Sequence, residues 1–117
     1  DDAASWFAQG LAAGKVQNHQ ATIAWNLAGL ASVMAMRGQP DQSARLSGAA
    51  EALRMSIGCR SAPAARLLYE RSIATARAQL GEGGFAAAWA AGGALTLEQA
   101  IAYALGENAE AHSSHMA

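Results

Sequence analysis

The sequence predicts an all-α protein built from antiparallel helical hairpins, with about six helices and no sheet. Apolar residues recur at three- and four-residue spacing along most of the 117 residues. Alanine, the strongest helix former, supplies much of the 52% hydrophobic content. No stretch shows the period-two alternation or the Val, Ile and Thr enrichment of a strand. The length suits one domain, which we place at residues 1–105.

The first expected helix runs from Ala3 to about Gly14 and carries Trp6, Phe7 and Leu11 at helical spacing. In a helical repeat, a preceding hairpin normally covers such a stripe. The chain starts at Asp1 without a Met and enters this helix at once, so we expect a fragment of a larger protein with the stripe left open. An open stripe favours a two-fold homodimer through this helix.

The second expected helix, from about Gln20 to Arg37, has two apolar faces and should therefore lie between neighbours. One face consists of Ile23, Leu27, Leu30 and Met34, and the other of Trp25, Ala28, Ala31 and Ala35. Trp25 lies off the first stripe. It is the aromatic residue that we expect to be exposed if any is.

A tight turn at Gly38-Gln39-Pro40 should join this helix to a third, because Gly favours a helix end and Pro a first turn. The third helix is expected from about Asp41 to Ile57, where Gly58 ends it. Its small residues allow close approach of the second helix. They are Ser43, Ser47 and Ala50.

The fourth expected helix starts near Pro63, with Ser61 as the N-cap candidate, and ends at the glycine cluster 81–84. A short fifth helix, Phe85 to about Ala91, should pair Phe85 with Trp89 one turn later. The next two glycines, 92 and 93, then predict a turn.

A capping box starts the sixth expected helix, because the Thr96 hydroxyl can accept from the amide of Gln99 while the Gln99 side chain reaches back. Leu97, Ile101 and Leu105 line one side of this helix, and Gly106 ends it. Residues 106–117 are polar and aperiodic. We expect them to form a disordered tail, part of which could derive from an expression vector.

Composition argues against several classes of partner. A net charge of −1 and scattered arginines do not suit a nucleic-acid surface, which needs clustered cations. No apolar run is long enough to span a membrane, and no signal pattern precedes the first helix. Cys59 is the single cysteine, so no internal disulfide can form and a cytoplasmic location is expected.

No residue pattern of a catalytic, cofactor or metal site stands out, and we expect a protein that is not an enzyme. His112 and His115 are spaced three apart but lie in the expected tail without a Cys or carboxylate shell. His19 stands alone before a helix, as a solvent-side or capping residue. Cys59 is read as a small loop residue, although Arg60 beside it leaves a mildly activated thiol open.

Three segments of the second and third expected helices carry a family likeness: Ala24-Trp25-Asn26-Leu27-Ala28-Gly29-Leu30-Ala31, Arg37-Gly38-Gln39-Pro40 and Ala44-Arg45-Leu46-Ser47-Gly48-Ala49-Ala50-Glu51-Ala52-Leu53-Arg54. They resemble the tetratricopeptide-like helical region of large bacterial regulators. The regulators in question are LuxR-type and MalT-like transcription factors and cyclase-linked predicted ATPases. The likeness continues through Tyr69-Glu70-Arg71, Leu80-Gly81-Glu82, Phe85-Ala86-Ala87-Ala88-Trp89 and Leu95-Thr96-Leu97-Glu98-Gln99-Ala100. Two features depart from the family pattern: residues 91–94 are neutral, and no helix-turn-helix follows residue 105.

The resemblance implies a non-catalytic scaffold that senses a protein partner or an effector and passes the signal to an ATPase or output domain of its parent chain. We therefore expect a protein–protein interaction module, with an interaction surface formed by Trp6, Phe7, Leu11 and Trp25. The alternative is a small-molecule sensor whose apolar pocket is lined by Trp25, Tyr69 and Trp89.

Overall fold

The computed structural model describes residues 2–58 and 63–106, and within these ranges every element is a helix. The elements are α1 (Asp2–Gln17), α2 (Gln20–Met36), α3 (Pro40–Ile57), α4 (Pro63–Gly93) and α5 (Leu97–Leu105). The all-α prediction is confirmed. None of the described helices is both long and apolar enough to cross a membrane.

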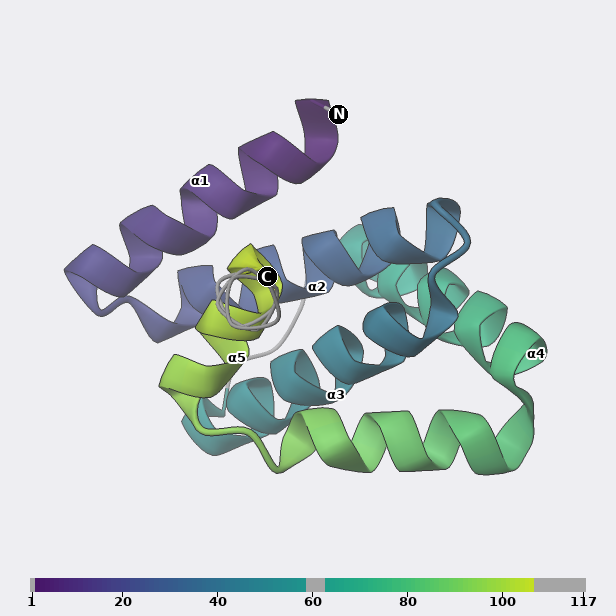
Figure 1. Ribbon diagram of the computed structural model, residues 1–117. Coiled ribbons are helices and arrows are strands. Elements are labelled where there is room, and N and C mark those ends of the chain that lie inside the picture. The colour runs from purple at the N-terminus through teal and green to yellow at the C-terminus, as the bar shows by residue number, and fades with distance from the viewer. Residues whose placement is uncertain (1, 59–62, 107–117) are drawn as a thin grey trace, which may run out of the picture.

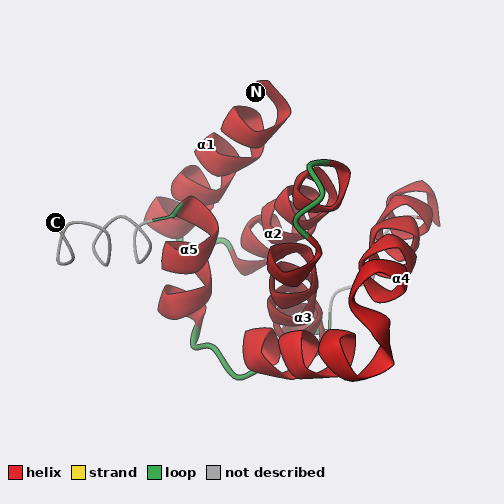
Figure 2. Ribbon diagram, turned by 45° about the vertical axis from the view of Figure 1, so that its right-hand side comes forward, coloured by secondary structure: helices red, strands yellow, loops and turns green. Residues whose placement is uncertain are grey.

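Helices α2 and α3 form the centre of the molecule (Figures 1 and 2). Helices α1 and α5 lie on one side of this pair and residues 63–80 of α4 lie on the other, while the last part of α4 crosses beneath α3, as Figure 2 shows. Helix α2 contacts α1, α3, α4 and α5. Helix α2 therefore lies between neighbours, as the sequence predicts.

The turn between α1 and α2 differs slightly from expectation, because α1 continues past Gly14 to Gln17. A Cβ on Gly14 would lie 3.1 Å from the Ile23 side chain, so this glycine marks a close approach of two helices and not a helix end. His19 is the N-cap of α2, and its Nδ1 accepts from the Thr22 amide at 3.2 Å. The expected capping role of His19 is confirmed.

The α2–α3 hairpin follows the predicted turn. Gly38 has φ 73°, and Pro40 is the first residue of α3. The buried Ser43 hydroxyl donates to the Ala31 carbonyl at 2.8 Å, which ties the two helices together. Gly58, with φ 68°, ends α3 in the left-handed conformation.

Helix α4 breaks at Gly81, whose φ of 78° and ψ of 165° are not helical, and this confirms the predicted break. The two arms, residues 63–80 and 82–93, run in different directions (Figure 1). The second arm continues through Gly92 and Gly93, so the predicted turn at these two residues is wrong. Gly92 is buried against α3, where a Cβ would lie 1.9 Å from the Arg45 carbonyl oxygen.

The expected aromatic pair forms in this second arm, with the ring centroids of Phe85 and Trp89 5.5 Å apart. The Arg77 guanidinium lies 4.6 Å from the Phe85 centroid. Phe85 is 6% exposed and belongs to a small cluster of buried residues between α3 and α4. The cluster consists of Ala44, Ala76, Phe85 and Ala88.

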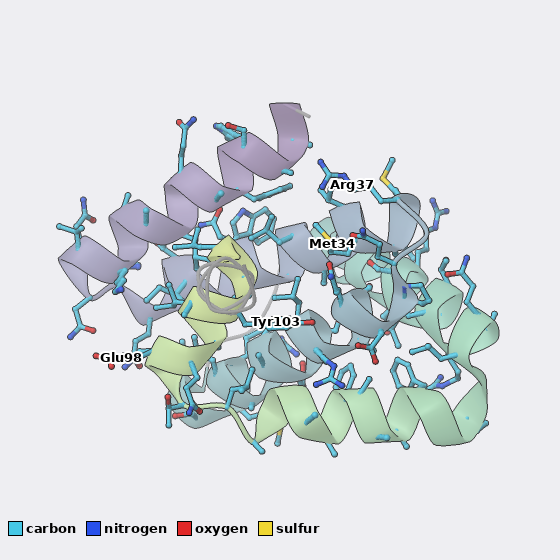
Figure 3. All side chains as sticks on the ribbon, viewed as in Figure 1. Met34, Arg37, Glu98 and Tyr103 are labelled. Carbon is cyan, nitrogen blue, oxygen red and sulfur yellow. The ribbon has the colours of Figure 1, made fainter. Side chains whose placement is uncertain are left out.

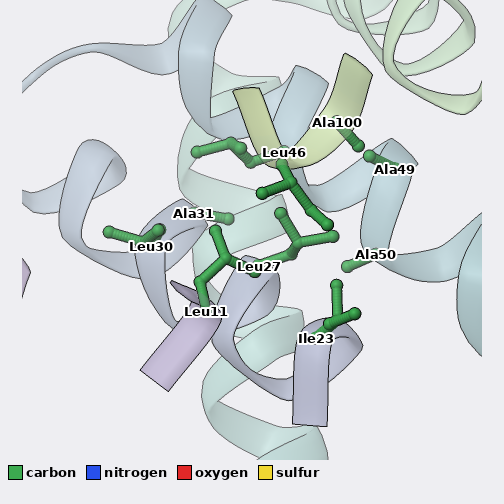
Figure 4. Packing of buried hydrophobic residues seen from close by; sticks show 10 residues of the cluster. Leu11, Ile23, Leu27, Leu30, Ala31, Leu46, Ala49, Ala50 and Ala100 are labelled. Carbon is green, nitrogen blue, oxygen red and sulfur yellow. The ribbon is translucent and has the colours of Figure 1, made fainter. Parts of the chain in front are cut away.

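The main hydrophobic core lies where α1, α2, α3 and α5 meet (Figure 4). Leu11, Ile23 and Leu27 are at most 1% exposed and form its centre. The remaining buried members are Leu30, Ala31, Leu46, Ala49, Ala50, Ala100 and Ile101. Alanine and serine take many of the buried positions, so the helices approach closely around few large side chains.

Helix α5 closes this core. The capping box is present, with the Gln99 amide donating to the Thr96 hydroxyl at 3.1 Å and the Thr96 amide donating to the Gln99 side chain at 2.9 Å. Tyr103 reaches from α5 toward α3 (Figure 3). Burial raises the pKa of Tyr103 above its usual value of 10.0; Arg45 lowers it and Asp41 raises it.

Some predicted features lie outside the described residues. They are the Ser61 cap, the Cys59 thiol, the Tyr69 side chain, His112 and His115, and the tail after residue 106.

Candidate binding groove

A half-open groove of about 420 Å³ lies between α1, α2 and α4. We call it the α1–α2–α4 groove. Its lining comes from Ala3 and Phe7 of α1, from Arg71, Ser72 and Thr75 of α4, and from α2 residues Trp25, Ala28, Gly29, Ser32, Val33, Ala35 and Met36. The volume falls within the usual range of ligand sites, about 300–1,000 Å³.

Helix α2 forms the floor of the groove, where several of its side chains are small. Ala28, Gly29 and Ser32 follow one another along the floor. Phe7 packs directly on Gly29, where an added Cβ would lie 2.3 Å from the Phe7 ring. Phe7 is therefore held against α2 as a fixed wall.

Large apolar side chains stand at the edges of the groove and are unusually exposed. Trp25 is 54% and Met36 87% exposed, and both line the groove. Trp6, 69% exposed, lies beside Phe7 with ring centroids 5.5 Å apart. Exposed apolar groups that gather around a concave surface mark binding sites more often than scattered ones do.

The α4 wall carries the polar groups of the groove. The hydroxyls of Ser32 and Ser72 lie 2.9 Å apart and link α2 to α4. Ser32 also contacts the Ala28 carbonyl, and the Thr75 hydroxyl donates to the Arg71 carbonyl at 3.0 Å. Arg71 is the one charged residue among the described residues of the lining. The described part of the groove is thus mostly apolar on its floor and carries a single positive charge on one wall.

Two of the four residues expected on the interaction surface, Phe7 and Trp25, line the groove, and Trp6 lies next to it. Leu11 is 0% exposed, so its expected place on the surface is wrong. The Leu11 side chain lies in the core between α1, α2 and α5. Of the expected open stripe, only Trp6 remains largely exposed.

The expected aromatic pocket is not assembled as predicted. Trp25 lines the groove, but Trp89 packs with Phe85 against the α3–α4 cluster. The sequence reasoning missed Met36, Arg71, Ser72 and Thr75. Hydrophobic periodicity could not place Arg71, Ser72 and Thr75 here, because spacing along α4 does not say which helix α4 packs against. Met36 lies 11 residues after Trp25 on α2, a spacing that puts the two residues on one face.

The titratable residues form no metal site in the part of the chain that the structure describes. No group of three or more His, Cys, Asp or Glu side chains gathers within residues 2–58 and 63–106.

Comparison with family models, with curated proteins and with solved structures found no match to this chain. The assignment of the groove therefore rests on the geometry of this chain alone.

Proposed function

We propose that this chain is a protein–protein interaction module and that the α1–α2–α4 groove binds an apolar face of its partner. The supporting observation is the groove itself, a concave surface whose edges carry Trp25 and Met36 at more than half exposure. Aromatic residues and Met are enriched where proteins contact one another. Burying these side chains in an interface contributes about 25 cal/mol of favourable free energy for each Å² of apolar area removed from water.

The shape of the groove favours an amphipathic helix as the bound element. Trp25 and Met36 are 11 residues apart on α2, which corresponds to about 17 Å along the helix axis, or three turns. A helix of that length presents apolar residues at positions i, i+4 and i+7 to a hydrophobic groove. The small floor residues Ala28 and Ser32, beside the position where Phe7 covers Gly29, leave room for such side chains.

The likeness to tetratricopeptide-like regions supports a parent protein of the bacterial signalling or transcription-regulatory kind, acting in the cytoplasm. In such a protein the partner helix would belong to an ATPase or output domain of the same chain, or to a second protein. The all-helical hairpin architecture is compatible with this role.

The proposal is tested by selecting helix-forming peptides of about 15 residues from a randomised display library against the full chain. We expect recovered peptides to share apolar residues at i, i+4 and i+7. Thr75→Trp, which fills the groove from its α4 wall, should abolish their binding. Ala74→Trp places the same ring on an exposed neighbour outside the lining and should leave binding intact. Peptides that bind both variants equally would contradict the proposal.

A second candidate function is the sensing of a small apolar effector, because the cavity of about 420 Å³ could hold one beside Trp25. A ligand at about 100 times its Kd adds roughly 2.7 kcal/mol to stability. A thermal-shift screen would therefore detect it. A shift lost in Thr75→Trp and kept in Ala74→Trp would favour the effector over the partner helix.

A further inference from the structure

Arg71 differs from several other arginines of the described chain in its electrostatic surroundings. Arg45 pairs with Asp41 at 2.8 Å, and Arg77 lies 3.4 Å from Glu82. Arg54 pairs with Glu51. Among the acidic side chains that the structure describes, none pairs with Arg71.

The position of Arg71 makes its charge part of the groove. It lines the α4 wall next to the buried Ser72, which is bonded to Ser32 on the floor. Leu67, one turn earlier on α4, is 53% exposed and adds apolar surface beside it. A guanidinium stays protonated under all ordinary conditions. Within its described lining, the groove therefore presents one positive charge beside a largely apolar floor.

A partner that covers this groove removes water from around Arg71. A bound helix without an acidic residue there would leave the guanidinium less solvated and unpaired, which weakens binding. A carboxylate at the same place accepts two parallel N–H bonds from the planar guanidinium. The single charge thus selects among partners that share the same apolar pattern.

We propose that the groove recognises an amphipathic helix that carries, beside its i, i+4 and i+7 apolar residues, an Asp or Glu positioned to pair with Arg71. This inference rests on the proposed function and adds the chemistry of the partner. Charge complementarity with Arg71 on the α4 wall favours a partner helix with an acidic flank over a helix that is wholly apolar or basic.

Parallel selections of helix-forming peptides against the wild-type chain and Arg71→Glu test the inference. Against the wild type, we expect Asp or Glu at one fixed offset from the apolar positions. Against Arg71→Glu, we expect Lys or Arg at that offset with the apolar pattern unchanged. Arg71 is exposed, so the variant should keep its helical content and melting temperature.

Affinity measurements by titration calorimetry complete the test. Replacing the acidic residue of a selected peptide by Gln should weaken binding to the wild type about fivefold, and Arg71→Glu should weaken the acidic peptide at least as much. A peptide with Lys at that position should bind Arg71→Glu more tightly than wild type. Lys15→Glu makes the same change in net charge in the last turn of α1, away from the groove lining, and should have no such effect.

Three outcomes would overturn the inference. Apolar-patterned peptides without acidic enrichment would leave the proposed function standing and remove the role of Arg71. A second outcome is that no peptide is recovered and that octanoate stabilises the wild type but not Arg71→Glu. This result would make a small acid the ligand of the groove and would contradict both the proposed function and the acidic partner helix. Sedimentation of the chain as a dimer that dissociates in Thr75→Trp but not in Ala74→Trp would make a second copy the occupant.

Discussion

Gly92 of α4 packs so closely on Arg45 of α3 that an added Cβ would lie 1.9 Å from the Arg45 carbonyl oxygen and 2.7 Å from its carbonyl carbon. One turn away, a Cβ on Gly48 would lie 2.3 Å from the Trp89 carbonyl oxygen. The second arm of α4 therefore rests on α3 through backbone at two positions. These contacts set how closely the second arm packs on α3.

Gly92→Ala should destabilise the protein by about 1–3 kcal/mol, although Ala favours a helix more than Gly by about 1 kcal/mol. The new methyl meets backbone atoms that cannot rotate away, so α3 and α4 must separate. Gly83→Ala is the matched control, because nothing lies within 4 Å of its Cβ and φ is not positive. That variant should gain about 0.5 kcal/mol. Urea unfolding measures the midpoints of Gly92→Ala and Gly83→Ala. Equal midpoints for the two variants would contradict the close contact at Gly92.

Leu11→Ala should cost about 2–5 kcal/mol, because Leu11 is 0% exposed at the centre of the main core. Trp6→Ala, on the exposed side of the same helix, should change the free energy of unfolding by no more than about 0.5 kcal/mol. Chemical denaturation measures both values. A larger loss of stability for Trp6→Ala than for Leu11→Ala would contradict the packing of α1 with its Leu11 side on the core.

Stability should fall at high pH because of Tyr103. Burial raises the folded-state pKa of Tyr103 above its usual value of 10.0, so the folded protein holds a proton that the unfolded chain releases. The contribution of Tyr103 to the free energy of unfolding is fully present below pH 10, the pKa of a tyrosine in the unfolded chain. It is lost as the pH rises through the pKa of Tyr103 in the folded protein. Tyr103→Phe should remove this part of the alkaline loss. Urea unfolding at a series of pH values above 9 compares the two chains, and parallel curves would argue against a buried phenol.

Features that depend on neighbouring residues in sequence could be predicted. The Gly38 turn, the Gly58 and Gly81 helix ends and the Thr96 capping box are each set by a glycine backbone or by side chains within one turn. The two apolar faces of α2 likewise follow from spacing along one helix. Local chemistry therefore sufficed for the fold class and for most helix boundaries.

Features that depend on which helices meet could not be predicted. Gly92 and Gly93 look like a turn in sequence, yet they are a place where two helices approach closely. Leu11 belongs to an apolar stripe, but spacing does not say whether α2 or a missing neighbour covers it. Arg71 and Trp25 share a groove only because α4 returns alongside α2 after α3. The α4 wall of the candidate site was therefore beyond sequence reasoning.

The most direct test of the groove as a binding site uses two exposed methionines that occupy similar positions. Met36 ends α2 at 87% exposure and lines the groove; Met55 lies in the last turn of α3 at 73% exposure and does not. Each substitution to Glu places the same charge near a helix C-terminus, so effects on folding should match. Titration with one selected helical peptide should show affinity at least about tenfold lower for Met36→Glu and unchanged for Met55→Glu. Equal affinity of the peptide for both variants would contradict binding in the α1–α2–α4 groove.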